Sequence, residues 1–123
     1  MAVLMSAIPR AAWHDLVLLN LRLLADLNLQ RAAWIRGAGT CPDATELLCA
    51  LFDDSGLDEL LEDGEVFWPE LDHHFRVMGQ FAERIETERS PEEILGDPLW
   101  RTFATLSGKA LAALEARLES PGA

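Results

Sequence analysis

Lysine, tyrosine and cysteine are scarce in this chain. Its 123 residues include one lysine, Lys109, no tyrosine and two cysteines, and the formal net charge is −11. A protein that binds a nucleic-acid duplex needs a basic surface to displace counterions from the phosphates. The shortage of basic residues therefore excludes nucleic acid, and equally an anionic membrane surface, as a binding partner.

The two cysteines do not indicate a disulfide scaffold. Cys41 and Cys49 form no CxxC motif and there are no further cysteines, and a chain of this length buries an adequate core without covalent staples. Cys49 stands among leucines, so we expect it to be a small buried hydrophobic residue.

A long apolar run is also absent. The most apolar segment, 16–29, is interrupted by asparagine, arginine and aspartate, whereas a membrane helix needs about 20 apolar residues with few or no charges. The first nine residues have no basic region of the kind that opens a signal peptide. We therefore expect no membrane association and a cytoplasmic location.

The remaining composition is that of a globular helical protein. Half of the residues are apolar and a quarter are charged. Apolar residues recur at three- and four-residue spacing, and no window alternates with period two. The sequence predicts an all-α, single-domain helical bundle spanning residues 1–123, with an N-terminal arm (1–9) and a C-terminal tail (120–123). Three long helices are expected at about 11–36, 68–88 and 98–119, joined by short helices.

Residues that favour helix ends stand at the expected boundaries. Gly37 would stop the first helix, Asp43 with the glutamate three positions on resembles a capping box, and Pro69 suits a first helical turn. Ser90 and Asp97, each followed by proline, mark two further helix starts. Of the four tryptophans, we expect those at positions 34 and 100 to lie in the core.

The negative charge is concentrated in the middle of the chain. Between Arg36 and Arg76 there are eleven acidic residues and no basic ones, so the other ten acidic and ten basic residues balance. This segment therefore carries the whole net charge. One interpretation is a surface of negative potential that attracts a basic partner. The alternative is that some of the carboxylates cap helices and the rest solvate short connecting helices.

The first interpretation gives a set of candidate partner-binding residues. Two adjacent aromatic residues follow the acidic run, and they are either a hydrophobic staple folded onto the core or exposed anchors for a partner. The candidate acidic residues are Asp53, Asp54, Asp58, Glu59, Glu62, Asp63 and Glu65, and the candidate anchors are Phe67 and Trp68.

Catalytic and metal-binding patterns are weak. Glu70 and His73 form half of the Glu-x-x-His arrangement of carboxylate-bridged metal bundles, with His74 beside them, but no second such pair exists. Segment 53–58 is acidic but lacks the ligand spacing of a calcium loop, and no nucleophile has a base beside it in sequence. We expect no enzyme activity, no cofactor and no bound metal, with a site at Glu70, His73 and His74 as a remote alternative.

Three segments resemble blocks of a known group of proteins. Residues 21–37 (LRLLADLNLQRAAWIRG), 51–57 (LFDDSGL) and 96–101 (GDPLWR) are similar to an uncharacterised family of small acidic all-helical bacterial proteins. The family implies a helical fold and no particular activity. In size, acidity and helix content the chain is also similar to bacterial immunity proteins, which neutralise basic toxin domains.

These observations lead to two functional hypotheses. In the first, the chain is a non-enzymatic protein-binding module, an immunity or antitoxin type of neutraliser whose acidic surface meets a basic protein, such as a toxin domain. In the second, it is a structural or regulatory helical protein that self-associates as a homodimer through the apolar excess of its first helix.

Overall fold

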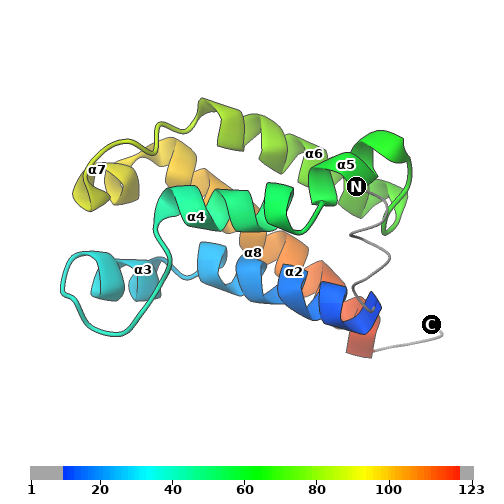
Figure 1. The fold of residues 1–123 in the computed structure, drawn as a ribbon, viewed down its shortest axis with the longest axis horizontal. Helices are drawn as coiled ribbons and strands as arrows, with labels where there is room; N and C mark the ends of the chain where they lie inside the picture. Colours follow the sequence, from blue (N-terminus) through cyan, green and yellow to red (C-terminus); the bar gives the residue numbers. More distant parts are fainter. Residues whose placement is uncertain (1–9, 120–123) are drawn as a thin grey trace.

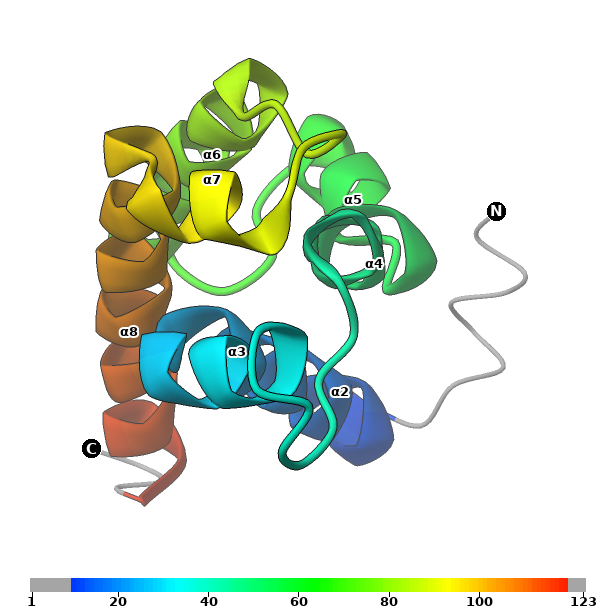
Figure 2. The same cartoon turned by 90° about the vertical axis from the view of Figure 1, so that its left-hand side faces the viewer.

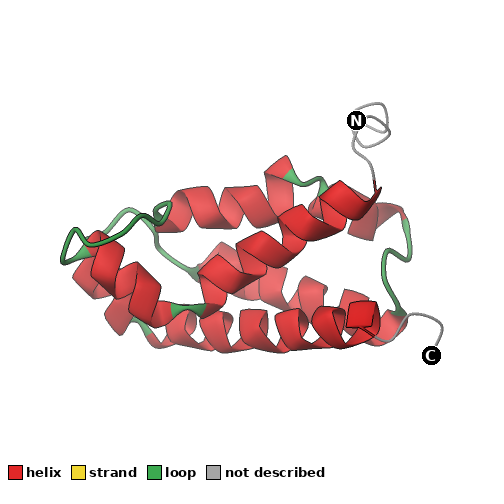
Figure 3. Cartoon of the chain, turned by 90° about the horizontal axis from the view of Figure 1, so that it is seen from below, coloured by secondary structure: helices red, strands yellow, loops and turns green. Residues whose placement is uncertain are grey.

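The computed structural model describes residues 10–119 and confirms the all-α fold (Figures 1 and 3). No strand occurs within these residues. The arm 1–9 and the tail 120–123 lie outside the described residues. The helices are α2 (Arg10–Ala25), α3 (Leu27–Trp34), α4 (Ala44–Cys49), the π-helical turn η1 (Ala50–Asp54), α5 (Leu57–Asp63), α6 (Pro69–Arg84), α7 (Pro91–Gly96) and α8 (Pro98–Glu119).

The C-terminal helix α8 organises the bundle. It packs against both α2 and α6, while the short helices α4, η1 and α5 cover the opposite side of the core (Figures 1 and 2). The apolar stripes read from the sequence face inward, because residues three and four positions apart share one face of a helix. The largest fully buried side chains include Leu21, Leu47, Phe75, Trp100 and Phe103.

The first long segment is divided at Asp26 rather than continuing as one helix. The backbone of Asp26 leaves the helical region (φ −97°, ψ 83°), and its carboxylate accepts the N–H of Leu29 at 3.0 Å, which caps α3. The side chain of Gln30 donates to the carbonyl oxygens of Leu23 and Leu24 at 2.8 and 3.1 Å. Capping on both sides stabilises the break, because the backbone groups that the interrupted helix would have paired find other partners.

The other helix ends agree with the sequence, apart from one. Ser90 and Glu93 form a reciprocal capping box, and Asp43 accepts the N–H of Glu46 at 2.8 Å. Pro69 occupies the first turn of α6. This helix ends at Arg84, four residues before the expected boundary, and the following segment is extended at Ile85 (ψ 125°).

Two expectations about buried residues need correction. Trp100 is fully buried as expected, but Trp34 is only half-buried, because its indole N–H is directed to the loop and donates to the Pro42 oxygen at 3.1 Å. Trp13, 6 % exposed, lies in the core instead. Cys49 is half-buried rather than enclosed, because it lies on the side of α4 that borders a surface hollow.

Candidate functional site: an acidic groove between η1–α5 and α6

All seven candidate carboxylates are exposed at the surface. They lie on η1, on α5 and in the turn that follows α5. Within residues 10–119 the ion pairs are Arg22–Glu115 and Arg89–Asp97, and neither involves this set. The candidates therefore stand on adjoining elements, and no ion pair among the described residues neutralises them. They are Asp53, Asp54, Asp58, Glu59, Glu62, Asp63 and Glu65.

A buried serine fixes the turn that presents these carboxylates. The Ser55 hydroxyl donates to the Leu51 carbonyl and accepts the N–H of Leu57 at 3.2 Å, which links the end of η1 to the start of α5. The indole N–H of Trp13 donates to the Ser55 carbonyl at 2.8 Å and attaches the same turn to α2. Gly56 has φ +76°, a conformation that favours glycine, and this lets the chain reverse between the two elements.

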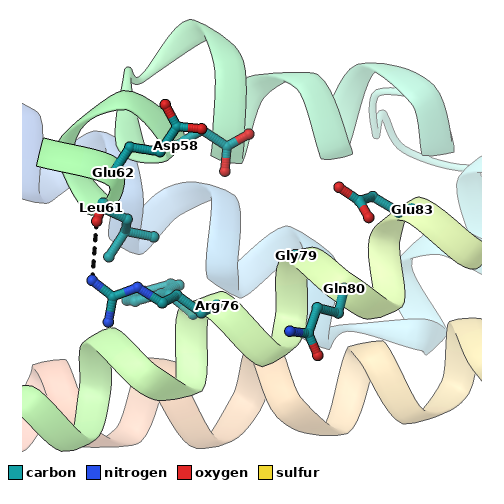
Figure 4. Close-up of a pocket in the computed structure, with 8 residues that line it drawn as sticks. Asp58, Leu61, Glu62, Arg76, Gly79, Gln80 and Glu83 are labelled. Atoms are coloured by element: carbon teal, nitrogen blue, oxygen red, sulfur yellow. Dashed lines mark hydrogen bonds between the residues drawn. The ribbon is translucent and has the colours of Figure 1, made fainter.

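Between η1–α5 and α6 the surface is hollowed into a groove. It consists of two adjoining hollows of about 310 and 220 Å³, which share Asp58, Gly79 and Glu83. Figure 4 shows Asp58 and Glu62 on one wall and Glu83 on α6 opposite. We call these three carboxylates, together with Asp53 in the second hollow, the groove carboxylates.

One end of the groove differs from its centre. At one end, the Arg76 guanidinium crosses from α6 and donates from Nη2 to the Leu61 carbonyl oxygen at 3.0 Å (Figure 4). The Leu61 carbonyl belongs to the last turn of α5, where helix carbonyls have no partner within the helix. In the middle, Gly79 contributes no side chain: a Cβ there would meet only Phe52 Cε1, at 3.9 Å. The groove is thus closed by a cation at one end and open at its centre.

The electrostatics of the groove centre on Asp58. Burial raises the pKa of the Asp58 carboxyl, and the negative charges of Asp53, Glu62 and Glu83 raise that pKa further. A raised carboxyl pKa means that the ionised form is disfavoured by its surroundings. The groove carboxylates therefore repel one another, and a cation placed among them would relieve that repulsion.

Glu83 belongs to this site although the sequence analysis did not select it. It stands beyond Arg76, outside the run of acidic residues without bases, and it reaches the groove because α6 lies beside α5. Its spacing from Arg76 and Gly79, seven and four positions, places all three on one face of the helix. The sequence shows this spacing, but it does not show that α5 lies across the groove from Glu83.

The two candidate aromatic anchors pack against the core. Phe67 stacks on Trp13 with ring centroids 5.5 Å apart and lies 5.4 Å from Phe75. Trp68 is half-buried, and the Arg117 Cζ lies 5.1 Å from its ring centroid. The arrangement agrees with the staple interpretation, in which both rings secure the start of α6, and it removes them from the set of freely exposed anchors.

The histidine-containing segment of α6 is divided between surface and interior contacts. His73 is exposed, as is Glu70, whereas His74 is half-buried and donates from Nε2 to the Leu106 carbonyl oxygen at 2.7 Å. The two histidines therefore point in different directions. Among the described residues, no three histidine, cysteine, aspartate or glutamate side chains are grouped so that they could hold a metal ion.

Comparison with known proteins gives no relative. The chain matches no family model, no curated protein and no solved structure. None of the helices in the described part of the chain is long and apolar enough to cross a membrane.

Proposed function

We propose that this protein is a non-enzymatic binding module that neutralises a basic partner protein, in the manner of an immunity protein or antitoxin. The observation that carries the proposal is the set of exposed carboxylates on η1 and α5 without an ion-pair partner among the described residues. Dense like charge costs stability through mutual repulsion. A basic partner would offset that cost on binding.

The arrangement suits two steps of recognition. At a distance, concentrated negative potential accelerates encounter with a positively charged surface, and this acceleration weakens as salt shortens the Debye length. In contact, the carboxylates would pair with lysine and arginine side chains of the partner. A binder of this kind acts by covering an effector's active site or by presenting the charge pattern of its phosphate-containing substrate.

The experiment compares two triple variants of equal charge change. The first replaces exposed carboxylates of the acidic surface: Asp54→Asn, Glu59→Gln and Asp63→Asn. The control replaces exposed carboxylates elsewhere: Glu86→Gln, Glu88→Gln and Glu92→Gln. Both are used as bait in lysate of the native cell at about 50 mM and at several hundred mM salt. The Debye length is much shorter at the higher salt concentration, so charge attraction is weaker there.

We expect a basic protein to be retained by the wild type and the control at low salt and released at high salt. Its purified form should bind the first variant about tenfold more weakly, as expected if three charge contacts each contribute roughly half a kcal/mol. Equal affinity for both triple variants, with equal salt dependence, would overturn the proposal.

A second candidate function, self-association through α2, is favoured by one observation. Leu19 is 50 % exposed on this helix, and Leu16 and Leu23 on the same face are half-buried. Sedimentation over a wide range of concentrations, with Leu19→Lys beside the wild type, separates the two functions. A wild-type dimer that the substitution converts to a monomer would support self-association, and a monomer at all concentrations would exclude it.

A further inference from the structure

We propose that the groove between η1–α5 and α6 is where a lysine or arginine side chain of the basic partner inserts. This inference rests on the proposed function and names the place where the partner makes contact. The observations behind it are the shape, lining and charge of the groove. It gives a direct role in binding to Glu83, which lies outside the acidic run.

The lining of the groove matches the two-part chemistry of a long basic side chain. Its walls carry Asp58 and Glu83, while Leu48, Phe52 and Ala82 supply apolar surface in the same hollow. Lysine and arginine place an aliphatic stem on apolar surface and keep the charged end among polar groups. A small inorganic cation would need only oxygen ligands and would leave the apolar part of the lining unused.

The position of Gly79 keeps the groove open. Glycine inside a helix is destabilising relative to alanine, and here no close contact requires it, since a Cβ would lie 3.9 Å from Phe52 Cε1, its nearest atom outside the helix's own backbone. Gly79 belongs to both hollows, so any larger side chain at this position would occupy the space that the partner's side chain needs.

Charge completes the fit and sets its direction. Asp58 and Glu83 come from opposite walls, and Asp53 and Glu62 lie in one hollow each. Arg76 holds the Leu61 carbonyl at one end and would repel a second cation there. The incoming charge is therefore expected near Asp58 and Glu83, on the side of the groove away from Arg76.

The test uses a defined probe and the full-length protein. The probe is a blocked hexapeptide of alternating glycine and arginine, and its control replaces each arginine with citrulline, which has the same length without the charge. Backbone amide shifts from ¹⁵N-labelled protein report the place of binding, and titration at about 50 mM salt gives the affinity. The variants are Gly79→Leu, which fills the groove, and Glu83→Gln, with Glu86→Gln as the matched control.

We expect the arginine peptide to shift the amides around Gly79 and Glu83 in the wild type, and the citrulline peptide to leave them unchanged. Glu83→Gln should weaken binding about fivefold, the size of one exposed charge pair, and Gly79→Leu should weaken it at least as much, because the leucine side chain takes the space that the arginine would occupy. Glu86→Gln should stay within about twofold, because an exposed charge outside the site contributes little. Glu83→Gln keeps the test valid if Gly79→Leu disturbs the helix. The amide spectrum of the unbound Glu83→Gln variant should match that of the wild type, which shows that its fold is intact.

The remaining outcomes separate this inference from the proposed function. If the groove variants bind like the wild type while Asp54→Asn, Glu59→Gln and Asp63→Asn together weaken binding, the acidic surface acts without the groove and the inference is overturned. If the arginine and citrulline peptides bind alike to every variant, charge plays no part and both proposals fail.

Discussion

The indole N–H of Trp100 donates to the side-chain oxygen of Gln30 at 2.9 Å, and both side chains are fully buried. The amide nitrogen of the same Gln30 donates to the carbonyl oxygens of Leu23 and Leu24, at the end of α2. One buried amide thus joins the break in the first helical segment to the first turns of α8. These hydrogen bonds explain why Gln30, a polar residue, lies in the core.

Replacing Gln30 with leucine should destabilise the protein by about 1–3 kcal/mol, because the Trp100 N–H and the two carbonyl oxygens would lose a partner while remaining buried. Urea unfolding followed by circular dichroism gives the change. Gln80→Leu is the matched control, since Gln80 is exposed on α6 and should change stability by less than about 0.5 kcal/mol. Similar losses for both variants would show that the buried network contributes nothing specific.

Asp72 is expected to be essential for the entry into α6. Asp72 is 1 % exposed, and its carboxylate accepts the backbone N–H groups of Val66 and Phe67 at 2.8 and 2.9 Å. Asp72→Asn leaves one acceptor oxygen for two donors and should cost about 1–3 kcal/mol. The same denaturation experiment measures it, with the exposed Asp63→Asn as the control. A loss no greater than that of the control would contradict this role.

The raised pKa of Asp58 predicts a pH dependence of stability. The folded state binds the proton at a higher pH than the unfolded state does, so stability falls as pH rises from the ordinary carboxyl pKa through the raised one. Asp58→Asn removes this loss and should stabilise the protein at pH 7 by about half a kcal/mol or less, since the group is largely exposed.

The gain from Asp58→Asn should disappear below the ordinary carboxyl pKa, where Asp58 is protonated in both states. Thermal unfolding across pH 3–8 measures it, and added salt should reduce the gain by screening the like charges. A destabilised variant at neutral pH would contradict the repulsion inferred for the groove.

For Asp97 we expect the opposite dependence of stability on pH from that of Asp58. The hydrogen bond from Arg89, at 2.7 Å, and that from the Leu99 N–H lower the pKa of its carboxyl. The stabilisation is therefore present above the ordinary carboxyl pKa and is lost as pH falls through the lowered one. Asp97→Asn should cost about 1 kcal/mol at pH 7 and less as the solution is acidified.

The exposed ion pair Arg22–Glu115 provides the comparison for Asp97. Its side chains are 53 % and 40 % exposed, against 25 % and 15 % for Arg89–Asp97. Glu115→Gln should therefore change stability by only a few tenths of a kcal/mol. If Glu115→Gln is the more costly of the two substitutions, the stabilising role assigned to Asp97 is wrong.

Local signals in the sequence were accurate where the physical cause was itself local. Ser90 with Glu93 and Pro69 at the start of α6 act within one helical turn, and the structure confirms both. The break at Asp26 was missed because the flanking segments are both apolar and helical in composition. The break is stabilised in part by the hydrogen bond from Trp100 to Gln30, and Trp100 is distant in the chain.

The candidate site divides in the same way. The helical class and the concentration of acidic residues follow from the order of the residues, because apolar periodicity and charge are properties of neighbouring positions. In contrast, that Glu83 faces Asp58 across a groove and that Phe67 stacks on Trp13 became visible in the fold alone. Those pairs depend on which helices pack side by side, and that is set by the packing of the whole core rather than by any single segment.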